Sequence, residues 1–215
     1  MKPIDDYDCI SSEAPSLFFW QGYDPSLKYV VSCSAIVTLA GLLLIDPLPL
    51  AEEPLAALVQ EEGAAPAAIV LTSGNHQRHS LFFAKKYSIP IYAPAGAGEE
   101  IVADVWYQPG SDFLGLKSVA LPGFGPGETA LLDSTGKVLI LGDALTNADG
   151  EGLLLLPKKY CENYAAAKKS LRALQEFSPT MLLTAHGLPI VTDASERLEH
   201  FKQSYSHEKM ADEFC

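Results

Sequence analysis

Three kinds of sequence feature are scarce or missing in this chain of 215 residues, and each excludes a class of protein. The longest strongly apolar run, residues 35–45, is too short for a transmembrane helix, which needs about 20 residues. The first residues are acidic where a secretion signal needs a basic flank. Lysine and arginine number 15 against 27 aspartates and glutamates, without a basic tract. Binding to nucleic acid or to an anionic membrane is therefore not expected.

The cysteine content is also low. Cys9, Cys33, Cys161 and Cys215 form no CxxC pair and show no metal-type spacing, which is typical of reduced thiols in a cytoplasmic protein. Hydrophobic residues make up 48% and charged residues 20% of the chain, a composition typical of globular proteins. At this length we expect one domain, residues 1–215, with a core large enough to fold without a metal ion.

The hydrophobic pattern changes along the chain. The first third contains strand-like runs at residues 17–20, 28–32, 35–38 and 42–45 and predicts hairpins. Strands at 68–71, 89–92 and 181–184 then alternate with helices at 52–62, 79–87, 164–177 and 193–209, and with a hairpin around 134–136. We expect Gly63 to end the first helix and Asp193 to cap the last. This order predicts two packed sheets with helices outside.

Polar residues follow several of the predicted strands. Asp46 follows the run 42–45, and a polar segment at 72–79 follows the strand 68–71. Asp143 and His186 each come just after a later strand. A loop at residues 121–127 adds two Pro-Gly pairs. Because loops that share one edge of a sandwich lie close together, we expect these segments to line one site.

The order and spacing of these segments, from about residue 30 to 189, resemble the metallo-β-lactamase fold superfamily. That superfamily includes glyoxalase II-like thioesterases, lactonases, nucleases and flavodiiron proteins. The resemblance implies an α/β fold, a four-layer αββα sandwich with two mixed sheets and outer helices. It also implies two metal ions that share a hydroxide, held by an HxHxDH loop, a His of the Pro-Gly loop, a bridging Asp and a last His. Zinc in such a site lowers the pKa of its bound water to about 7.

Most of the ligands that the resemblance implies are missing here. Only Asp143 and His186 match the expected ligand types. The other ligand positions hold Ser73 and Asn75 for the first two histidines, Gln77 for the Asp, Arg78 for the third His, and Phe124 for the His of the Pro-Gly loop. The chain is therefore identified as a divergent, glyoxalase II-like member with a degenerate metal-binding motif.

The 72–79 loop is also similar to a degenerate branch of the superfamily, in which the motif reads Thr-Asn-x-x-His-x-Arg. Thr72, His76 and Arg78 occupy the matching places, with Ser73 in place of the Asn. Arg78 brings a permanent cation to a position that serves a metal ion elsewhere in the superfamily. We therefore hypothesise that the Arg78 guanidinium replaces the second metal and pairs with Asp143.

A shift of one residue in the same loop gives a different hypothesis. His76 and His79 then fall on the second and last His of HxHxDH, and Gly74 would permit the adjustment. With Asp143 and His186 they would supply four N/O ligands, enough for a single zinc or iron ion. The simpler interpretation of His79 is a residue at the start of the following helix.

Several other residues have a structural interpretation. His200 and His207 are expected on the surface of the last helix, and Asp46 is expected to orient neighbouring loops. Residues 158–160, Lys-Lys-Tyr, follow the leucine run 153–156, and from this place in the sequence alone we expect them to border a substrate cleft. The leucine run 153–156 is either a strand or an exposed patch that docks a partner.

The sequence favours a divergent protein of unknown substrate that lacks the dinuclear site and is noncatalytic or binds a small anionic ligand. The first alternative is a mononuclear metal-dependent hydrolase of an ester, thioester or lactone, and the second is a homodimeric interaction protein. No cofactor is favoured apart from the single zinc or iron of the first alternative. The candidate pocket residues are Thr72, Asn75, His76, Arg78, Asp143 and His186.

Overall fold

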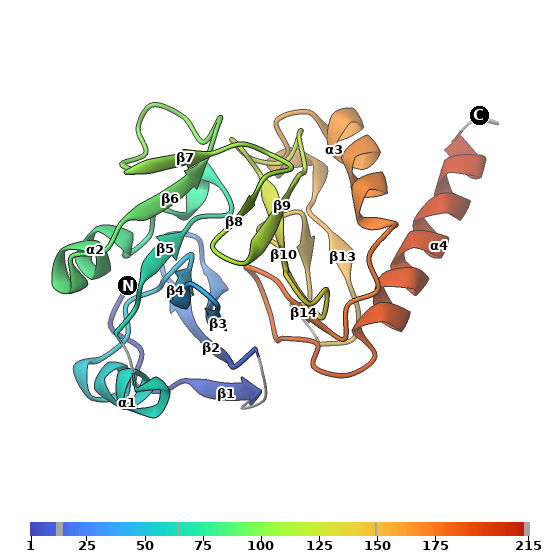
Figure 1. The fold of residues 1–215 in the computed structure, drawn as a ribbon. Helices are drawn as coiled ribbons and strands as arrows, with labels where there is room; N and C mark the ends of the chain where they lie inside the picture. Colours follow the sequence, from blue (N-terminus) through green and yellow to red (C-terminus); the bar gives the residue numbers. More distant parts are fainter. Residues whose placement is uncertain (12–14, 64, 149, 213–215) are drawn as a thin grey trace.

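The computed structural model describes residues 1–11, 15–63, 65–148 and 150–212, and it describes side chains up to residue 204 within these ranges. The predictions for His207 and Cys215 fall outside the described side chains. Figure 1 shows two sheets side by side, with α1 and α2 outside one of them and α3 and α4 outside the other.

The N-terminal sheet has seven strands in chain order from β1 to β7. Its first four strands are antiparallel, as the strand-rich first third predicted, and β4 to β7 are parallel. The strands are β1 (Asp8–Ser11), β2 (Leu17–Asp24), β3 (Tyr29–Thr38), β4 (Gly41–Ile45), β5 (Ala68–Val70), β6 (Ile91–Pro94) and β7 (Val105–Tyr107). Because β4 and β5 run in the same direction, Asp46 and the 72–79 loop leave the sheet at the same edge.

The second sheet has five strands in the order β14-β11-β10-β9-β8, and only the β11–β14 pair is parallel. Its strands are β8 (Asp112–Phe113), β9 (Leu116–Ala120), β10 (Thr129–Asp133), β11 (Val138–Ile140) and β14 (Met181–Leu183). The predicted hairpin around 134–136 joins β10 to β11. Because β11 and β14 are parallel, Asp143 and His186 also follow strands at one common edge.

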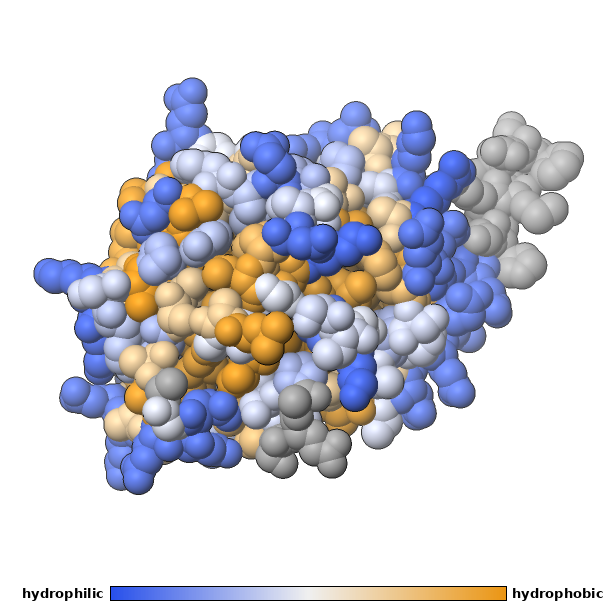
Figure 2. Space-filling view, viewed as in Figure 1, coloured by the Kyte–Doolittle hydropathy of each residue, from blue (hydrophilic) through white to orange (hydrophobic). Residues whose placement is uncertain are grey.

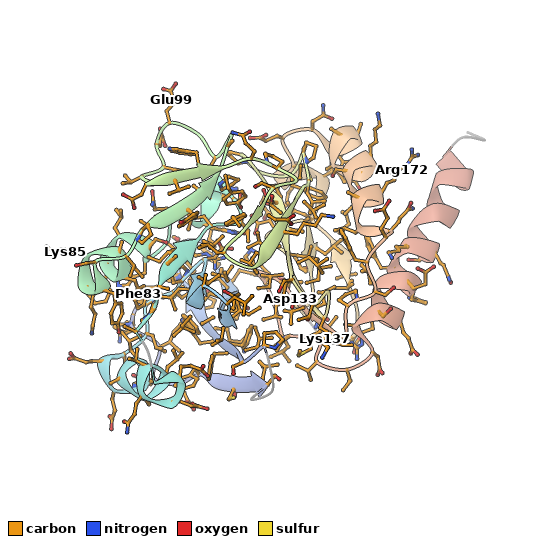
Figure 3. All side chains as sticks on the ribbon, in the orientation of Figure 1. Phe83, Lys85, Glu99, Asp133, Lys137 and Arg172 are labelled. Carbon is orange, nitrogen blue, oxygen red and sulfur yellow. The ribbon has the colours of Figure 1, made fainter. Side chains whose placement is uncertain are left out.

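Four α-helices are described: α1 (Glu52–Glu62), α2 (Ser80–Tyr87), α3 (Tyr164–Ser170) and α4 (Ala194–Asp212). Helix α1 matches its predicted bounds, and Gly63 ends it with a backbone hydrogen bond to Gln60. In Figure 3, Phe83 lies on the inner side of α2 and Lys85 on its outer side. The amphipathic pattern therefore turns the apolar side of α2 to the sheet.

Three groups of buried apolar side chains show that the fold has four layers. One lies between the seven-stranded sheet and α1 and α2, one lies between the two sheets, and one lies between the five-stranded sheet and α3 and α4. Hydrophilic residues lie over the coloured part of α4 in Figure 2, while apolar residues cross the middle of the same face. The chain thus folds as the expected αββα sandwich of the α/β class. Among the described helices, none combines the length and apolar character needed to cross a bilayer.

One predicted helix is shorter in the structure, and the two predicted strand runs 28–32 and 35–38 are parts of one strand, β3. The helix expected over residues 164–177 ends at Ser170 and continues as a 3-10 turn, Leu171–Leu174. The Ser170 hydroxyl donates to the Ala167 carbonyl, a local bond that competes with regular α-helix. The leucine run 153–156 contains a short strand, β13 (Leu154–Leu155), which pairs with β12 (Leu145–Thr146). The leucines of this run differ in exposure: Leu153 and Leu156 are buried, whereas Leu154 is exposed.

Candidate functional site

Asp46 stands at the centre of a buried network at the shared strand edge. It follows β4, and its two carboxylate oxygens accept hydrogen bonds from the backbone N–H and the hydroxyl of Thr72. These bonds tie the end of β4 to the start of the 72–79 loop, as expected of a residue that orients neighbouring loops. The same carboxylate also contacts His76, which gives it an electrostatic role as well.

His76 lies buried between two carboxylates. Its Nδ1 is 2.9 Å from Asp46 Oδ2, and its Nε2 is 3.1 Å from Asp143 Oδ1. A carboxylate accepts hydrogen bonds, so both ring nitrogens must carry protons for both bonds to form. Burial and the charge of Arg78 would lower the pKa of His76, but the charges of Asp46 and Asp143 outweigh them and raise it to about 10. His76 is therefore an imidazolium cation at neutral pH.

A short turn places the His76 side chain. Residues Gly74–His76 form a 3-10 turn that starts at Ser73, whose side chain accepts from the Asn75 N–H. Gly74 packs so closely that a Cβ there would lie 1.9 Å from the Ala97 carbonyl oxygen. Only glycine fits this approach, so Gly74 fixes the course of the loop rather than leaving its register free.

Asp143 accepts hydrogen bonds from two histidines on different loops. His76 Nε2 and His186 Nε2 are each 3.1 Å from the same oxygen, Asp143 Oδ1. Burial would raise the pKa of Asp143, but the charge of His76 and the hydrogen bonds from both histidines hold it well below its usual range. Asp143 is thus a carboxylate held between two imidazoles.

His186 links this network to β3 and to the solvent-facing side of the site. Its Nδ1 is 3.2 Å from the Val30 carbonyl oxygen, and the Tyr29 ring lies edge-on at 5.3 Å. Both Val30 O and Asp143 Oδ1 are hydrogen-bond acceptors, so each ring nitrogen of His186 faces an acceptor. The histidine that follows the last strand therefore lies beside Asp143 in this network.

Arg78 does not pair with Asp143, contrary to our hypothesis. Its Nη1 donates to the carbonyl oxygens of Ser32 at 2.6 Å and Asp46 at 3.1 Å. The backbone of Arg78 has a φ of 40°, in the left-handed region. Its side chain lies toward Ser32, in the first half of β3. Within the described ranges, the ion pairs of Asp143 are with His76 and His186. A cation does meet the Asp143 carboxylate, but the sequence argument named the wrong residue.

The other replaced positions have structural roles. Phe124 is fully buried in the apolar cluster beneath α3 and α4. Gln77 turns away from the site and makes two 2.8 Å hydrogen bonds with the backbone of Val102. His79 is the residue just before α2 and lies against the rings of Phe82 and Phe83, which agrees with its simpler interpretation, and it also lines the cavity of the site.

Glu128 is a buried acidic residue of the site that the sequence argument missed. Its Oε1 accepts from the backbone N–H groups of Asp143 and Ala144, whereas Oε2 is buried without a hydrogen-bond partner in the described structure. Burial and the charge of Asp143 raise the pKa of Glu128 to about 8. Gly142 leaves it room, since a Cβ there would lie 2.4 Å from Oε1. The sequence signal was a lone charge between a Pro-Gly turn and an apolar strand.

The network forms part of the wall of a cavity of about 1060 Å³. Asn75, His76, Arg78, Asp143 and His186 line it, while Thr72 lies behind His76. The structure thus brings together all six candidate residues. Tyr160 lines the same cavity, but Lys158 faces a separate one beside α3.

The donor atoms present do not match a dinuclear metal centre. Within the described part of the chain, no group of three or more His, Cys, Asp and Glu side chains is arranged to hold a metal ion. His76 has both ring nitrogens on carboxylates and offers no lone pair while it is protonated. His79 lies at the start of α2 against two aromatic rings, so the four-ligand hypothesis lacks a described contact between His79 and the other three side chains.

Comparison with known proteins identifies the family. The family model for the metallo-β-lactamase superfamily matches residues 10–205, so the chain belongs to that superfamily. DIM-1 metallo-β-lactamase, in a crystal exposed to ceftazidime, is 13% identical with a TM-score of 0.73, and the match covers 96% of this chain and 100% of DIM-1. A metallo-β-lactamase from Pontibacter korlensis is 13% identical with a TM-score of 0.70, over 94% and 99% of the two chains.

A metallo-β-lactamase family protein from Thermus thermophilus is 19% identical, with a TM-score of 0.61 over 91% of this chain and 81% of that one. At these identities the likeness to solved structures shows the fold. No curated protein matches the chain significantly.

Proposed function

We propose that this protein is a metal-independent member of the metallo-β-lactamase superfamily that binds a small anionic ligand. The observation that carries the proposal is the position of His76, a buried, protonated imidazole with one ring nitrogen on the carboxylate of Asp46 and the other on that of Asp143. By resemblance to the superfamily, Asp143 occupies the position of the carboxylate that bridges two metal ions. A cationic side chain lies on that carboxylate here, and the site keeps its charge balance without a metal ion.

Arg78 and His186 make the site suitable for an anion. Both line the cavity and both are cationic or capable of carrying a charge. The Arg78 hydrogen bonds use Nη1, and no acceptor for Nη2 or Nε is found among the described residues. These N–H groups can therefore donate to a ligand carboxylate or phosphate, the pairing that guanidinium geometry favours.

Anion binding at Arg78 can be tested by calorimetry with acetate and inorganic phosphate. Arg78→Met should weaken binding by about ten- to a hundredfold, since a hydrogen bond to a charged group contributes roughly 1.5–3 kcal/mol. The matched control is Arg172→Met, which removes an exposed arginine outside this cavity. Unchanged anion affinity in Arg78→Met would contradict the proposal.

A mononuclear metal-dependent hydrolase remains the second candidate, because three donor groups converge: two Nε2 atoms lie 3.1 Å from one Asp143 oxygen. The two candidates differ in metal content, measured by inductively coupled plasma mass spectrometry on protein expressed with added zinc, iron and manganese. We expect only trace metal. Stoichiometric metal that is lost in His186→Ala would favour the hydrolase and lead to a screen of esters, thioesters and lactones.

A further inference from the structure

One wall of the cavity is apolar, and the proposed anion site does not explain it. The leucine run noted in the sequence supplies Leu154, Leu155 and Leu156 to this wall, followed by Pro157. The structure places Leu154 on the surface with 55% of its area exposed. A short strand pair, β12–β13, holds these side chains in place at the cavity.

Further large apolar side chains are exposed around the same cavity. Leu27 and Tyr160 are each 62% exposed, and Tyr29 is 43% exposed. Single exposed apolar residues are ordinary, but several that line one cavity indicate a binding surface. A cavity of about 1060 Å³ is at the upper end of small-molecule sites, roughly 300–1,000 Å³. A small inorganic anion would leave most of this wall in water.

The charges around the cavity favour a head group with a single negative charge. Arg78 places a permanent cation at the cavity, but the carboxylates of Asp24 and Asp143 line the same cavity. Two nearby carboxylates repel a dianion more strongly than a monoanion. A carboxylate also fits the planar N–H groups of an arginine.

We propose that the ligand is an amphipathic carboxylate, with its acid group at Arg78 and its apolar chain or ring along Leu154 to Pro157 and Tyr160. This inference rests on the proposed function and extends it by naming the ligand class. The apolar part leaves water when it lies on this wall. Each methylene that becomes fully buried should tighten the dissociation constant by about fourfold.

The test is calorimetry at pH 7 with a series of straight-chain carboxylates, from butanoate to hexanoate to octanoate. Octylamine and octyl phosphate serve as probes of the same chain length with a different head group. We expect affinity to rise with chain length, octylamine to bind far more weakly than octanoate, and octyl phosphate to bind more weakly than octanoate. Octyl phosphate binding as well as octanoate would overturn the choice of a monoanionic head group.

Two variants locate the apolar part. Leu154→Ser should weaken octanoate binding severalfold and leave butanoate binding nearly unchanged, because the outer methylenes are the ones that reach Leu154. The matched control is Leu39→Ser, which removes a fully exposed leucine from the turn between β3 and β4, outside the cavity. Both leucines are exposed, so neither change is expected to prevent folding.

The outcomes separate this inference from the proposed function. Carboxylates that bind with an affinity independent of chain length would overturn the inference and leave the anion site intact. Octylamine and octanoate binding equally well would overturn the anion site and, with it, the choice of a carboxylate. An equal loss of octanoate affinity in the Leu154 and Leu39 variants would also contradict the inference. Absence of binding throughout would overturn both.

Discussion

A rise in pH should destabilise this protein, because His76 is protonated in the folded state and neutral in the unfolded one. Between pH 6.5, its ordinary pKa, and about 10, its pKa in the folded protein, the folded chain holds a proton that the unfolded chain has lost. Stability must then fall as pH rises. Each pH unit contributes about 1.4 kcal/mol, so the full interval corresponds to roughly 5 kcal/mol.

Another buried acid acts in the same direction at lower pH. Glu128 has a pKa of about 8 in the folded protein against an ordinary value of 4.5. Its contribution to the free energy of unfolding therefore decreases as the pH rises from 4.5, and most of this decrease has occurred by pH 8. The thiols of Cys33, Cys9 and Cys161, whose pKa values burial raises above 9.0, add a further fall that begins below pH 9. Between pH 8 and 9 the contribution of His76 is therefore isolated by comparing the wild type with a variant that lacks His76.

Urea denaturation at pH 8.0, 8.5 and 9.0 measures this effect directly. The His76 proton should account for about 1.4 kcal/mol of the wild-type loss between pH 8 and 9, so His76→Gln should lose about that much less. His200→Gln, which changes an exposed histidine of α4, should behave as the wild type does. Asp143→Asn should move the fall to lower pH, because it removes one of the two charges that raise the pKa of His76.

Nitrogen NMR of the imidazole rings gives an independent test on the folded wild type. At pH 8, His76 should show two protonated ring nitrogens. A neutral His76 ring at that pH, or equal pH slopes in the wild type and His76→Gln, would refute the reasoning that places a cation between Asp46 and Asp143.

Three further predictions concern the residues around His76. Glu128→Gln should abolish the fall in stability that the wild type shows between about pH 5 and 6.5, below the interval of His76, and should reduce the fall between pH 6.5 and 8, measured by urea denaturation. An unchanged pH profile would mean that Glu128 is not buried as an acid. Gly142→Ala should cost about 1–3 kcal/mol by overpacking against Glu128, whereas Gly152→Ala, with open space around it, should be nearly neutral. Thr72→Val should cost about 1–3 kcal/mol because it leaves buried polar groups without a partner, and Thr180→Val, at an exposed position, should cost less than about 1 kcal/mol.

Local patterns predicted most of the fold. Helix α1 and the β10–β11 hairpin follow from periodicity and from turn residues such as Gly63, because these signals act over a few neighbouring positions. The helix starting at Tyr164 ended early because a side-chain bond at Ser170 competes with the helix backbone. The spacing of apolar residues carries no information on such a side-chain bond.

Side-chain partners in the site depend on distances that the sequence does not contain. The six candidate residues do come together, because the parallel strand pairs β4–β5 and β11–β14 bring four loops to one edge. Arg78, the predicted partner of Asp143, was wrong, because Arg78 has a left-handed backbone and its side chain lies against Ser32. Glu128 was missed because its neighbours, Asp143 and Ala144, are 15 and 16 residues away in the sequence.

The charges of the site bear on the proposed metal independence. Asp46 is buried and the Asp143 side chain is largely buried, with 14% exposed, and removing the cation that balances such charge is strongly destabilising. His76 and Arg78 together supply two positive charges, as many as one divalent metal ion, and Glu128 stays protonated near neutral pH. A substitution that restores a single metal ligand, such as Arg78→His, would therefore remove a charge without supplying a complete ligand set. On the proposed function, metal binding should require several simultaneous changes, because each change alone unbalances the charges of Asp46 and Asp143.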